Sequence, residues 1–162
     1  MRIFLSLGTN LGHRLANLNK ALFLISNNTN IKILSKSKVY ETSPMENKNQ
    51  DYFLNQVIEI KTKIEPIDLL NFTQKIESKM GREKHSKKYQ PRIIDIDILS
   101  YNKLILDKQN LCIPHSKIKF RKFILKPWTD IAPNYILPNS KSTIKELLER
   151  ILHLEDKVSE YN

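Results

Sequence analysis

Two aspartates in one short strand are the residues that point most directly to chemistry. The string Ile94-Asp95-Ile96-Asp97-Ile98 alternates apolar and acidic positions. Because strand side chains alternate between faces, the isoleucines are predicted to enter the core while both carboxylates share the other face, ~7 Å apart. Two carboxylates this close repel each other, and hard oxygen ligands suit Mg²⁺. The pair is therefore predicted to hold magnesium. The alternative is an exposed strand face that happens to carry two aspartates.

The stretch 82–92, directly before this strand, is basic. Its basic side chains are Arg82, Lys84, His85, Lys87, Lys88 and Arg92. Cations beside a metal-binding carboxylate pair suit the phosphates of a nucleotide, because the metal and the guanidinium groups share the phosphate charge. The alternative is a solvated basic loop. Tyr89, in the same stretch, could stack on a base or simply anchor the loop.

Other catalytic patterns are not supported. The string Gly8-Thr9-Asn10-Leu11-Gly12 lacks the Lys-Ser/Thr of a phosphate-binding P-loop, so its glycines are interpreted as serving a strand-to-helix turn. The four histidines are scattered without the spacing of zinc ligands. His115, which follows Pro114, is compatible with a phosphate or ribose contact, although a lone histidine is more often structural.

A second group of residues could bind a flat ligand. Thr42-Ser43-Pro44-Met45 reads as a tight loop, Phe53 and Asn55 share one strand face, and Phe123 lies in a basic segment with Arg121. Two phenylalanine rings and an amide would give a heterocycle stacking and in-plane hydrogen bonds. The competing interpretation is that both rings belong to the core.

The composition bounds these hypotheses. A chain of 162 residues suits one domain, so a single domain over 1–162 is predicted. No apolar run reaches the length of a membrane span, and the one cysteine, Cys112, excludes an internal disulfide and favours a cytoplasmic location. The net charge of +10 favours an anionic partner, although solvated surface lysine would also explain it.

The elements that must position these residues follow from periodicity. Strands are predicted over 2–7, 31–40, 53–62 and 93–101, with helices over 10–26 and 66–80 between them. A short helix over 117–125, ended by Pro127, and a last helix capped at Thr143 are predicted to follow. The order strand-helix-strand-strand-helix-strand predicts a ferredoxin-like α+β fold: a four-stranded antiparallel sheet with two helices on one face, plus C-terminal extra elements.

Four strings together make the sequence resemble the 6-hydroxymethyl-7,8-dihydropterin pyrophosphokinase family of folate synthesis. They are Phe53-Leu54-Asn55, Gly81-Arg82, residues 91–98 (Pro-Arg-Ile-Ile-Asp-Ile-Asp-Ile) and Pro114-His115. The resemblance implies that the pyrophosphoryl group of ATP is transferred to the hydroxymethyl oxygen of the pterin, with release of AMP. It implies ATP as co-substrate, no nucleic-acid or membrane partner, and a monomer.

The resemblance also implies roles for particular residues. Asp95 and Asp97 would hold two Mg²⁺ ions, and Arg82 and Arg92 would bind the transferred phosphates. The nucleotide side would be formed by Glu77, Lys84, Lys88, Tyr89, Ile98, His115, Ser116 and Arg121. The pterin would be held by Thr42, Ser43, Pro44, Met45, Phe53, Asn55 and Phe123. The family often has tryptophan at the place of Tyr89 and tyrosine at that of Ser116, so the adenosine side departs from its pattern.

Two rival functions fit parts of the sequence. A non-enzymatic nucleic-acid module would use the positive charge, but RNA-binding sheets expose aromatic side chains where this strand exposes two aspartates. A metal-dependent nucleotide hydrolase would use the same carboxylates without needing a pterin.

Overall fold

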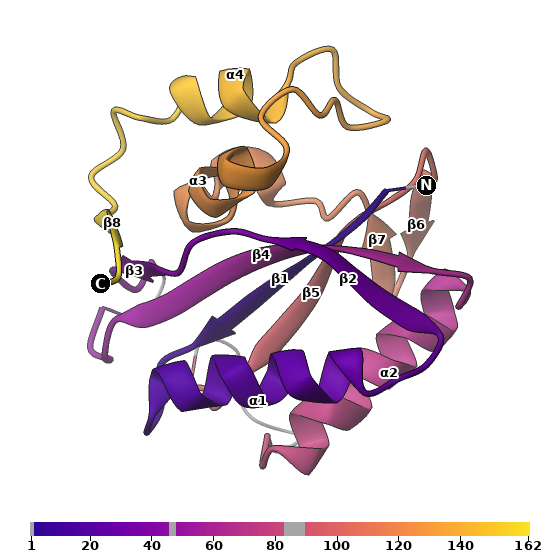
Figure 1. Cartoon of the computed structure of the whole chain (residues 1–162). Helices are drawn as coiled ribbons and strands as arrows, with labels where there is room; N and C mark the ends of the chain where they lie inside the picture. Colours follow the sequence, from indigo (N-terminus) through magenta and orange to yellow (C-terminus); the bar gives the residue numbers. More distant parts are fainter. Residues whose placement is uncertain (1, 46–47, 83–89) are drawn as a thin grey trace.

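An antiparallel sheet runs through the middle of the molecule and separates two layers of helices (Figure 1). The structure is a computed structural model that describes residues 2–45, 48–82 and 90–162. Helices α1 (Arg14–Ser26) and α2 (Pro66–Lys79) cover one face of the sheet, and α3 (Lys122–Ile131) and α4 (Ile144–Glu149) lie over the other. The strands of the sheet are β1 (Ile3–Thr9), β2 (Ile31–Lys36), β3 (Tyr40–Thr42), β4 (Phe53–Thr62), β5 (Asp95–Tyr101) and β8 (Val158–Glu160).

The sheet has the order β5-β1-β4-β3-β8, and β2 pairs with β4 beside β3. The mixed α+β class with an antiparallel sheet is confirmed, but the predicted sheet of four strands is wrong, because six strands pair among the described residues. One added strand is β8, which pairs with the short β3. A two-stranded sheet of β6 (Leu106–Lys108) and β7 (Leu111–Ile113) and a 3-10 helix, η1 (Ile118–Phe120), complete the fold.

The predicted strand over 31–40 is divided into β2 and β3. Between them, Ser37 accepts a hydrogen bond from Val57 N at its side-chain oxygen, and its backbone N–H donates to Val57 O. The Gln56 amide donates to Ser37 O. A serine can replace ladder hydrogen bonds in this way, so the chain stays bonded to β4 across the break, although Gln56 Oε1 is buried without a hydrogen-bond partner among the described residues.

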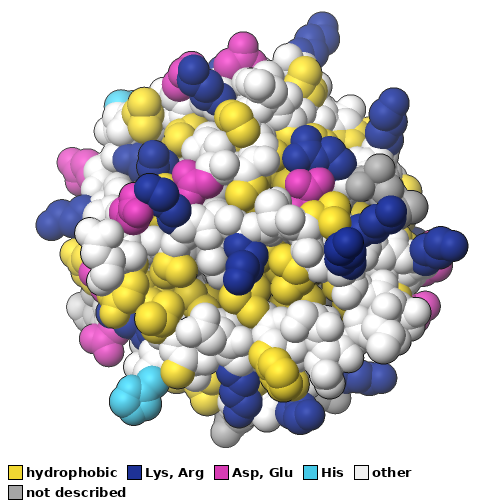
Figure 2. Space-filling view, in the orientation of Figure 1, with side chains coloured by type: hydrophobic (Ala, Val, Ile, Leu, Met, Phe, Trp, Pro, Cys, Tyr) yellow, Lys and Arg dark blue, Asp and Glu magenta, His cyan; other side chains and the backbone are white. Residues whose placement is uncertain are grey.

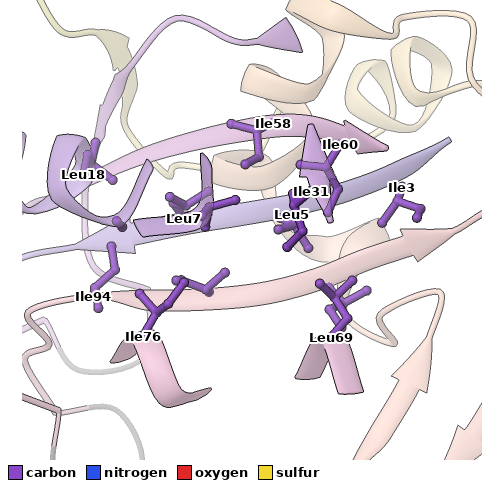
Figure 3. Packing of buried hydrophobic residues seen from close by; sticks show 14 of the residues in the cluster. Ile3, Leu5, Leu7, Leu18, Ile31, Ile58, Ile60, Leu69, Ile76 and Ile94 are labelled. Carbon is purple, nitrogen blue, oxygen red and sulfur yellow. The ribbon is translucent and has the colours of Figure 1, made fainter. Parts of the chain in front are cut away.

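Alternation along the central strands builds a separate core on each face. The larger core lies under α1 and α2 and contains Ile3, Leu5 and Leu7 of β1 together with Ile94 and the following isoleucines (Figure 3). The smaller core lies under α3 and α4 around Phe4, Val57, Leu99 and Trp128. The prediction that the isoleucines of β5 enter the core while its aspartates face the other side is confirmed.

Several helix boundaries differ from the predictions. Helix α1 begins at Arg14 rather than near Asn10, and Leu11 and Leu15 are exposed, whereas Leu18, Ala21 and Ile25 are buried against the sheet. Pro127 lies inside α3 instead of ending a helix. A proline inside a helix removes one N–H donor and crowds the carbonyl four residues earlier, but the burial of Leu125 and Trp128 on both sides of Pro127 favours continuing the helix.

Other local predictions are confirmed. Thr143 and Glu146 form a reciprocal capping box at the start of α4. Gly81 follows α2 with a φ of +102°, the left-handed conformation that ends a helix. Within the described residues, no helix is both long and apolar enough to cross a membrane. Lys and Arg side chains are distributed across the face shown in Figure 2 and are interspersed with Asp and Glu.

A candidate substrate pocket beside an aspartate pair

The floor of the candidate site is a row of residues across three strands. Gly8 of β1 lies opposite Asn55 of β4 on one side and opposite Asp95 of β5 on the other. Two residues along β1, Ser6 lies opposite Asp97. Gly8 therefore lies inside the strand rather than in the predicted turn, which Gly12, with a φ of +59°, serves instead. The small residues of β1 leave open space between the carboxylates and Asn55.

A cavity of about 440 Å³ opens above this floor, within the size range of small-molecule sites. One group of lining residues comes from the floor and the acidic strand: Ser6, Gly8, Asn55, Gln90, Arg92, Asp95 and Asp97. The other group comes from the loop after β3, from β4 and from the segment around η1: Thr42, Ser43, Pro44, Met45, Gln50, Phe53, Lys117, Phe120, Arg121 and Phe123. A single cavity is thus lined by both charged and apolar residues.

Two arginines neutralise Asp95. Arg82 Nη1 contacts one carboxylate oxygen of Asp95, and Arg92 Nη1 contacts the other. Arg82 also lies 2.6 Å from Glu77 Oε1. These contacts come from two separate segments, one just after α2 and one just before β5, and Gly81 provides the sharp exit from α2 that brings Arg82 to β5. The side chains of both arginines remain partly exposed, at 24% and 22%.

Asp97 is less directly paired than Asp95. Its Oδ2 lies 3.8 Å from Arg121 Nη1 and 4.0 Å from His115 Nε2, and 38% of its side chain is exposed. Partial burial at the cavity wall and repulsion by Asp95 raise the pKa of Asp97 to about 6. The structure therefore contains an acidic group whose ionised form would gain from another cation.

Burial also shifts the pKa of two neighbours. Burial raises the pKa of Glu77 to about 7, although Arg82 and the backbone N–H of Ile96, which donates to Glu77 Oε1 at 2.7 Å, favour its charged form. Burial and the nearby Arg121 guanidinium lower the pKa of His115 to about 4. At neutral pH His115 is therefore an uncharged imidazole beside Asp97.

Every residue predicted to hold a heterocycle lies on the cavity wall. These are Thr42, Ser43, Pro44, Met45, Phe53, Asn55 and Phe123. The Asn55 amide donates to Thr42 Oγ1 at 2.7 Å, which fixes the orientation of a buried amide. The Arg121 guanidinium lies 5.4 Å from the centre of the Phe123 ring. These predicted residues thus bring two phenylalanine rings and one oriented amide to the cavity wall, and their role stays a prediction.

The residues predicted for the nucleotide side are more dispersed. Arg121 lines the cavity, whereas Glu77 lies behind β5 and His115 lies beside Asp97 without lining the cavity. Ser116 is exposed next to His115, and Ile98 packs in the larger core, so a ligand contact by Ile98 would have to come from its backbone. Lys84, Lys88 and Tyr89 lie outside the described residues.

Some lining and supporting residues were not predicted. Asn10, only 2% exposed, connects two sides of the site: Arg92 N donates to its Oδ1 at 2.7 Å, and its Nδ2 donates to Gln50 Oε1 at 3.0 Å. Phe120, at the end of η1, is 66% exposed although it lines the cavity. Its spacing of three residues from Phe123 was available in the sequence, but nothing in the sequence alone indicated that it would stay exposed.

The residues present fit a magnesium ion whose coordination shell is completed by water and substrate oxygens. Among residues 2–45, 48–82 and 90–162, no group of three or more His, Cys, Asp and Glu side chains is gathered to enclose a metal. Asp95 and Asp97 nevertheless share one face beside the cavity, and Mg²⁺ is commonly bound by one or two carboxylates together with waters and substrate phosphates.

An antiparallel sheet that presents paired carboxylates and arginines to a cavity with aromatic walls is the arrangement of a phosphoryl-type transferase. Comparison with known proteins narrows this class. The chain belongs to the 7,8-dihydro-6-hydroxymethylpterin-pyrophosphokinase (HPPK) family, whose model matches residues 4–133. This finding confirms the resemblance inferred from the sequence.

Similar proteins support the family assignment. The 2-amino-4-hydroxy-6-hydroxymethyldihydropteridine pyrophosphokinase of Bacillus subtilis is 35% identical over 79% of this chain and 76% of its own length. The protein of the same name from Methylorubrum extorquens is 33% identical over 93% of both chains. The folic acid synthesis protein fol1 of Schizosaccharomyces pombe is 36% identical over 91% of this chain, which spans only 20% of that longer protein.

Solved structures support the fold. An HPPK-DHPS structure in complex with substrates matches 93% of this chain with a TM-score of 0.74 and 20% identity, and the match covers 43% of that chain. The wild-type HPPK-DHPS of Plasmodium falciparum matches the same share of the chain with a TM-score of 0.71 and 21% identity. At this identity the likeness concerns the fold alone.

Proposed function

We propose that this chain transfers pyrophosphate from ATP to 6-hydroxymethyl-7,8-dihydropterin in folate biosynthesis. In this reaction the hydroxymethyl oxygen forms a bond to the β-phosphorus, and the bond between the β-phosphorus and the oxygen bridging it to the α-phosphate breaks. The products are the pterin diphosphate, AMP and the proton of the hydroxyl group. The names of the family and of the two bacterial relatives support this activity.

The observation that carries the proposal is the shared cavity. Asp95, Asp97 and Arg92 line the same space as Phe53 and Phe123, the two rings predicted to hold the pterin. A pterin between the aromatic walls would therefore direct its substituent toward the carboxylates and arginines. Holding two reactants in this relation supplies much of the rate enhancement of phosphoryl-type transfer, which needs positioning and charge neutralisation more than covalent chemistry.

Asp95 and Asp97 are the residues that would hold Mg²⁺, and a count of two ions is the expectation from the family. When bound, the metal supplies neutralisation of phosphate charge and lowers the pKa of an oxygen bound to it. Arg82 and Arg92 now neutralise Asp95, and guanidinium groups bind phosphate oxygens equally well in bidentate geometry. If the phosphates of ATP enter between these arginines, both guanidinium groups would pair with phosphate oxygens instead of Asp95. The Asp95 carboxylate would then be available to bind the metal.

The other residues would orient and hold the substrates. Asn55, held by Thr42, would present its amide to the edge of the pterin ring. Arg121 and the uncharged His115 both lie beside Asp97, so they are placed to contact the nucleotide without adding negative charge to the site. Glu77 would act through Arg82, whose guanidinium it contacts at 2.6 Å.

Release of AMP from ATP, measured with and without 6-hydroxymethyl-7,8-dihydropterin at saturating Mg²⁺, tests the proposal. The expected result is AMP formation that depends on both the pterin and Mg²⁺. AMP or ADP formation without the pterin would instead make the chain a nucleotide hydrolase. Salt-sensitive RNA binding that does not require Mg²⁺, without any AMP release, would favour the nucleic-acid alternative.

The proposed function is accompanied by an expected sheet topology, domain extent, oligomeric state and location in the cell. We infer that β1 to β5 form a ferredoxin-like arrangement, which is supported by the order β5-β1-β4 with β2 and β3 beyond β4. The chain is proposed to act as one pyrophosphokinase domain over residues 1–162, as a monomer and in the cytoplasm. The fungal relatives are about five times as long as the region that this chain matches.

A further inference from the structure

The C-terminal segment, defined here as residues 152–161, contacts two opposite walls of the candidate pocket. It lies beyond residues 4–133, which the family model matches. Its strand β8 pairs with β3, and the chain before β8 passes the start of α3 (Figure 1). The pocket residues of β3 and those of α3 are therefore both held by one stretch of chain.

The first wall is held by backbone pairing. Thr42 of β3 lies opposite Val158 of β8. The pairing continues one residue further, because Ser43 N donates to Lys157 O at 3.0 Å and Lys157 N donates to Ser43 Oγ at 3.1 Å. Thr42 and Ser43 both line the cavity, and Thr42 lies opposite Phe53 in the β3–β4 ladder. Position and orientation of this wall thus depend on β8.

The second wall is held by one lysine. Lys122 Nζ donates to three backbone oxygens of the C-terminal segment: to Leu152 O at 3.2 Å, to Leu154 O at 2.7 Å and to Asp156 O at 3.2 Å. An ammonium group has three donors, so all three are used. Lys122 is the first residue of α3 and lies between Arg121 and Phe123, both of which line the cavity.

We propose that the C-terminal segment positions the aromatic walls of the pterin slot, with Lys122 as its main anchor. The segment connects the wall of Thr42, Ser43 and Phe53 to the wall of Phe123, and so sets the distance between the two phenylalanine rings. A flat ligand between two rings is sensitive to this distance, because dispersion contacts weaken steeply when a gap opens. The proposal rests on the proposed function, since it concerns the same pterin site.

Substitution of the anchor tests the proposal. In Lys122→Met the apolar stem is kept and the three charge-assisted hydrogen bonds are lost. Lys119→Met is the matched control, because Lys119 is an exposed residue of η1 that does not line the cavity, and its loss removes the same charge nearby. Binding of 6-hydroxymethylpterin is measured by calorimetry in the presence of α,β-methylene-ATP and Mg²⁺, and binding of the ATP analogue is measured alone.

The expected result is a selective loss of pterin affinity. Lys122→Met should weaken pterin binding about tenfold, which corresponds to about 1.4 kcal/mol, and should leave the affinity for the ATP analogue within about twofold. Lys119→Met should bind both ligands as the wild type does. Pterin binding that is unchanged in Lys122→Met would overturn the proposal, as would a loss of ATP-analogue affinity in equal proportion, which would make the segment a general stabilising element.

A second pair of variants tests the β8 side. Lys157→Pro removes the N–H that donates to Ser43, whereas Lys157→Ala removes the side chain and keeps this hydrogen bond. Weaker pterin binding in Lys157→Pro than in Lys157→Ala is expected, and equal binding by the two variants would overturn the β8 part of the proposal. If the wild-type chain binds no pterin, the proposed function itself is wrong. If the wild type binds pterin and the variants bind it equally well, only the positioning role of the C-terminal segment is wrong.

Discussion

Gly8 lies directly opposite Asn55 in the β1–β4 ladder, and a Cβ atom at Gly8 would lie only 2.9 Å from Asn55 Oδ1. Asn55 is 3% exposed and its amide is bonded to Thr42, so it has little freedom to move aside. Gly8→Ala is therefore expected to displace the Asn55 amide. Overpacking of this kind costs about 1–3 kcal/mol of folding stability, and pterin affinity should fall because the displaced amide no longer faces the ligand. Calorimetric titration with 6-hydroxymethylpterin checks this.

Ser6→Ala is the matched control for Gly8→Ala. Ser6 lies on the same strand and lines the same cavity, but this substitution adds no atom. It should bind pterin with nearly wild-type affinity. If Gly8→Ala bound pterin as well as Ser6→Ala does, the contact between Gly8 and Asn55 would not control the orientation of the amide.

The position of the aspartates could be predicted from the sequence because it depends on local alternation. A single strand with isoleucines at every second position has only one way to bury them, and Asp95 and Asp97 then share the opposite face. The same local reasoning predicted β4 with the boundaries that the structure shows and the cap at Thr143. The residues around Phe53 and Phe123 were proposed from the sequence as a site for a flat ligand, although a core role is the commoner fate of such rings, and the resemblance to the family then implied a pterin as the ligand.

What could not be predicted depends on contacts between distant segments. The row of Asp95, Gly8 and Asn55 requires the register of three strands, which no local pattern specifies. The three carbonyls that surround Lys122 lie 30 to 34 residues further along the chain, and a lysine in a basic segment reads as a surface charge. The helical position of Pro127 was also missed, because burial of its neighbours outweighed its local preference.

Phe120 and Phe23 provide a matched pair of exposed phenylalanines. Their exposed fractions are 66% and 63%, but only Phe120 lines the cavity. A ligand in the cavity would cover part of the Phe120 ring, and stacking on an aromatic ring contributes about 0.5–1.5 kcal/mol beyond the buried area. Phe120→Ala should therefore weaken ligand binding, whereas Phe23→Ala should not.

Separate titrations decide which heterocycle Phe120 contacts. A higher Kd for α,β-methylene-ATP alone would indicate contact with the adenine, and a higher Kd for 6-hydroxymethylpterin in the presence of the analogue would indicate contact with the pterin. Equal behaviour of Phe120→Ala and Phe23→Ala toward both ligands would show that the exposed ring is an ordinary surface residue.

Asp97 should be required for the chemical step rather than for folding. Its side chain accepts no hydrogen bond from a backbone group in the described part of the chain and is 38% exposed, so Asp97→Asn should not lower the melting temperature. Loss of a group that holds charge in the transition state typically lowers kcat by about 10²–10³-fold. AMP release under saturating substrates measures this effect.

Asp107→Asn, on the exposed strand β6, is the control for the Asp97 substitution. It should retain wild-type turnover and the same dependence on Mg²⁺ concentration. Turnover of Asp97→Asn close to that of the control would contradict the assignment of Asp97 to the metal. A similar loss in both variants would point to a general effect of charge.

Glu77 should make the stability of the free protein depend on pH. Its side chain is only 9% exposed, and burial raises its pKa from 4.5 to about 7, so the folded state binds a proton more tightly than the unfolded state does. The stabilisation is complete below pH 4.5 and is lost as the pH rises through about 7. At 1.36 kcal/mol for each pKa unit, the loss amounts to roughly 3 kcal/mol at most.

Urea denaturation at pH 5 and pH 8 compares wild type with Glu77→Gln. Glutamine cannot ionise, so the free energy of unfolding of Glu77→Gln should fall less between the two pH values than that of the wild type does. The raised pKa of Asp97 acts in the same direction in both proteins. An identical pH dependence in the two proteins would mean that Glu77 titrates normally in the folded state, with its ion pair to Arg82 offsetting the effect of burial.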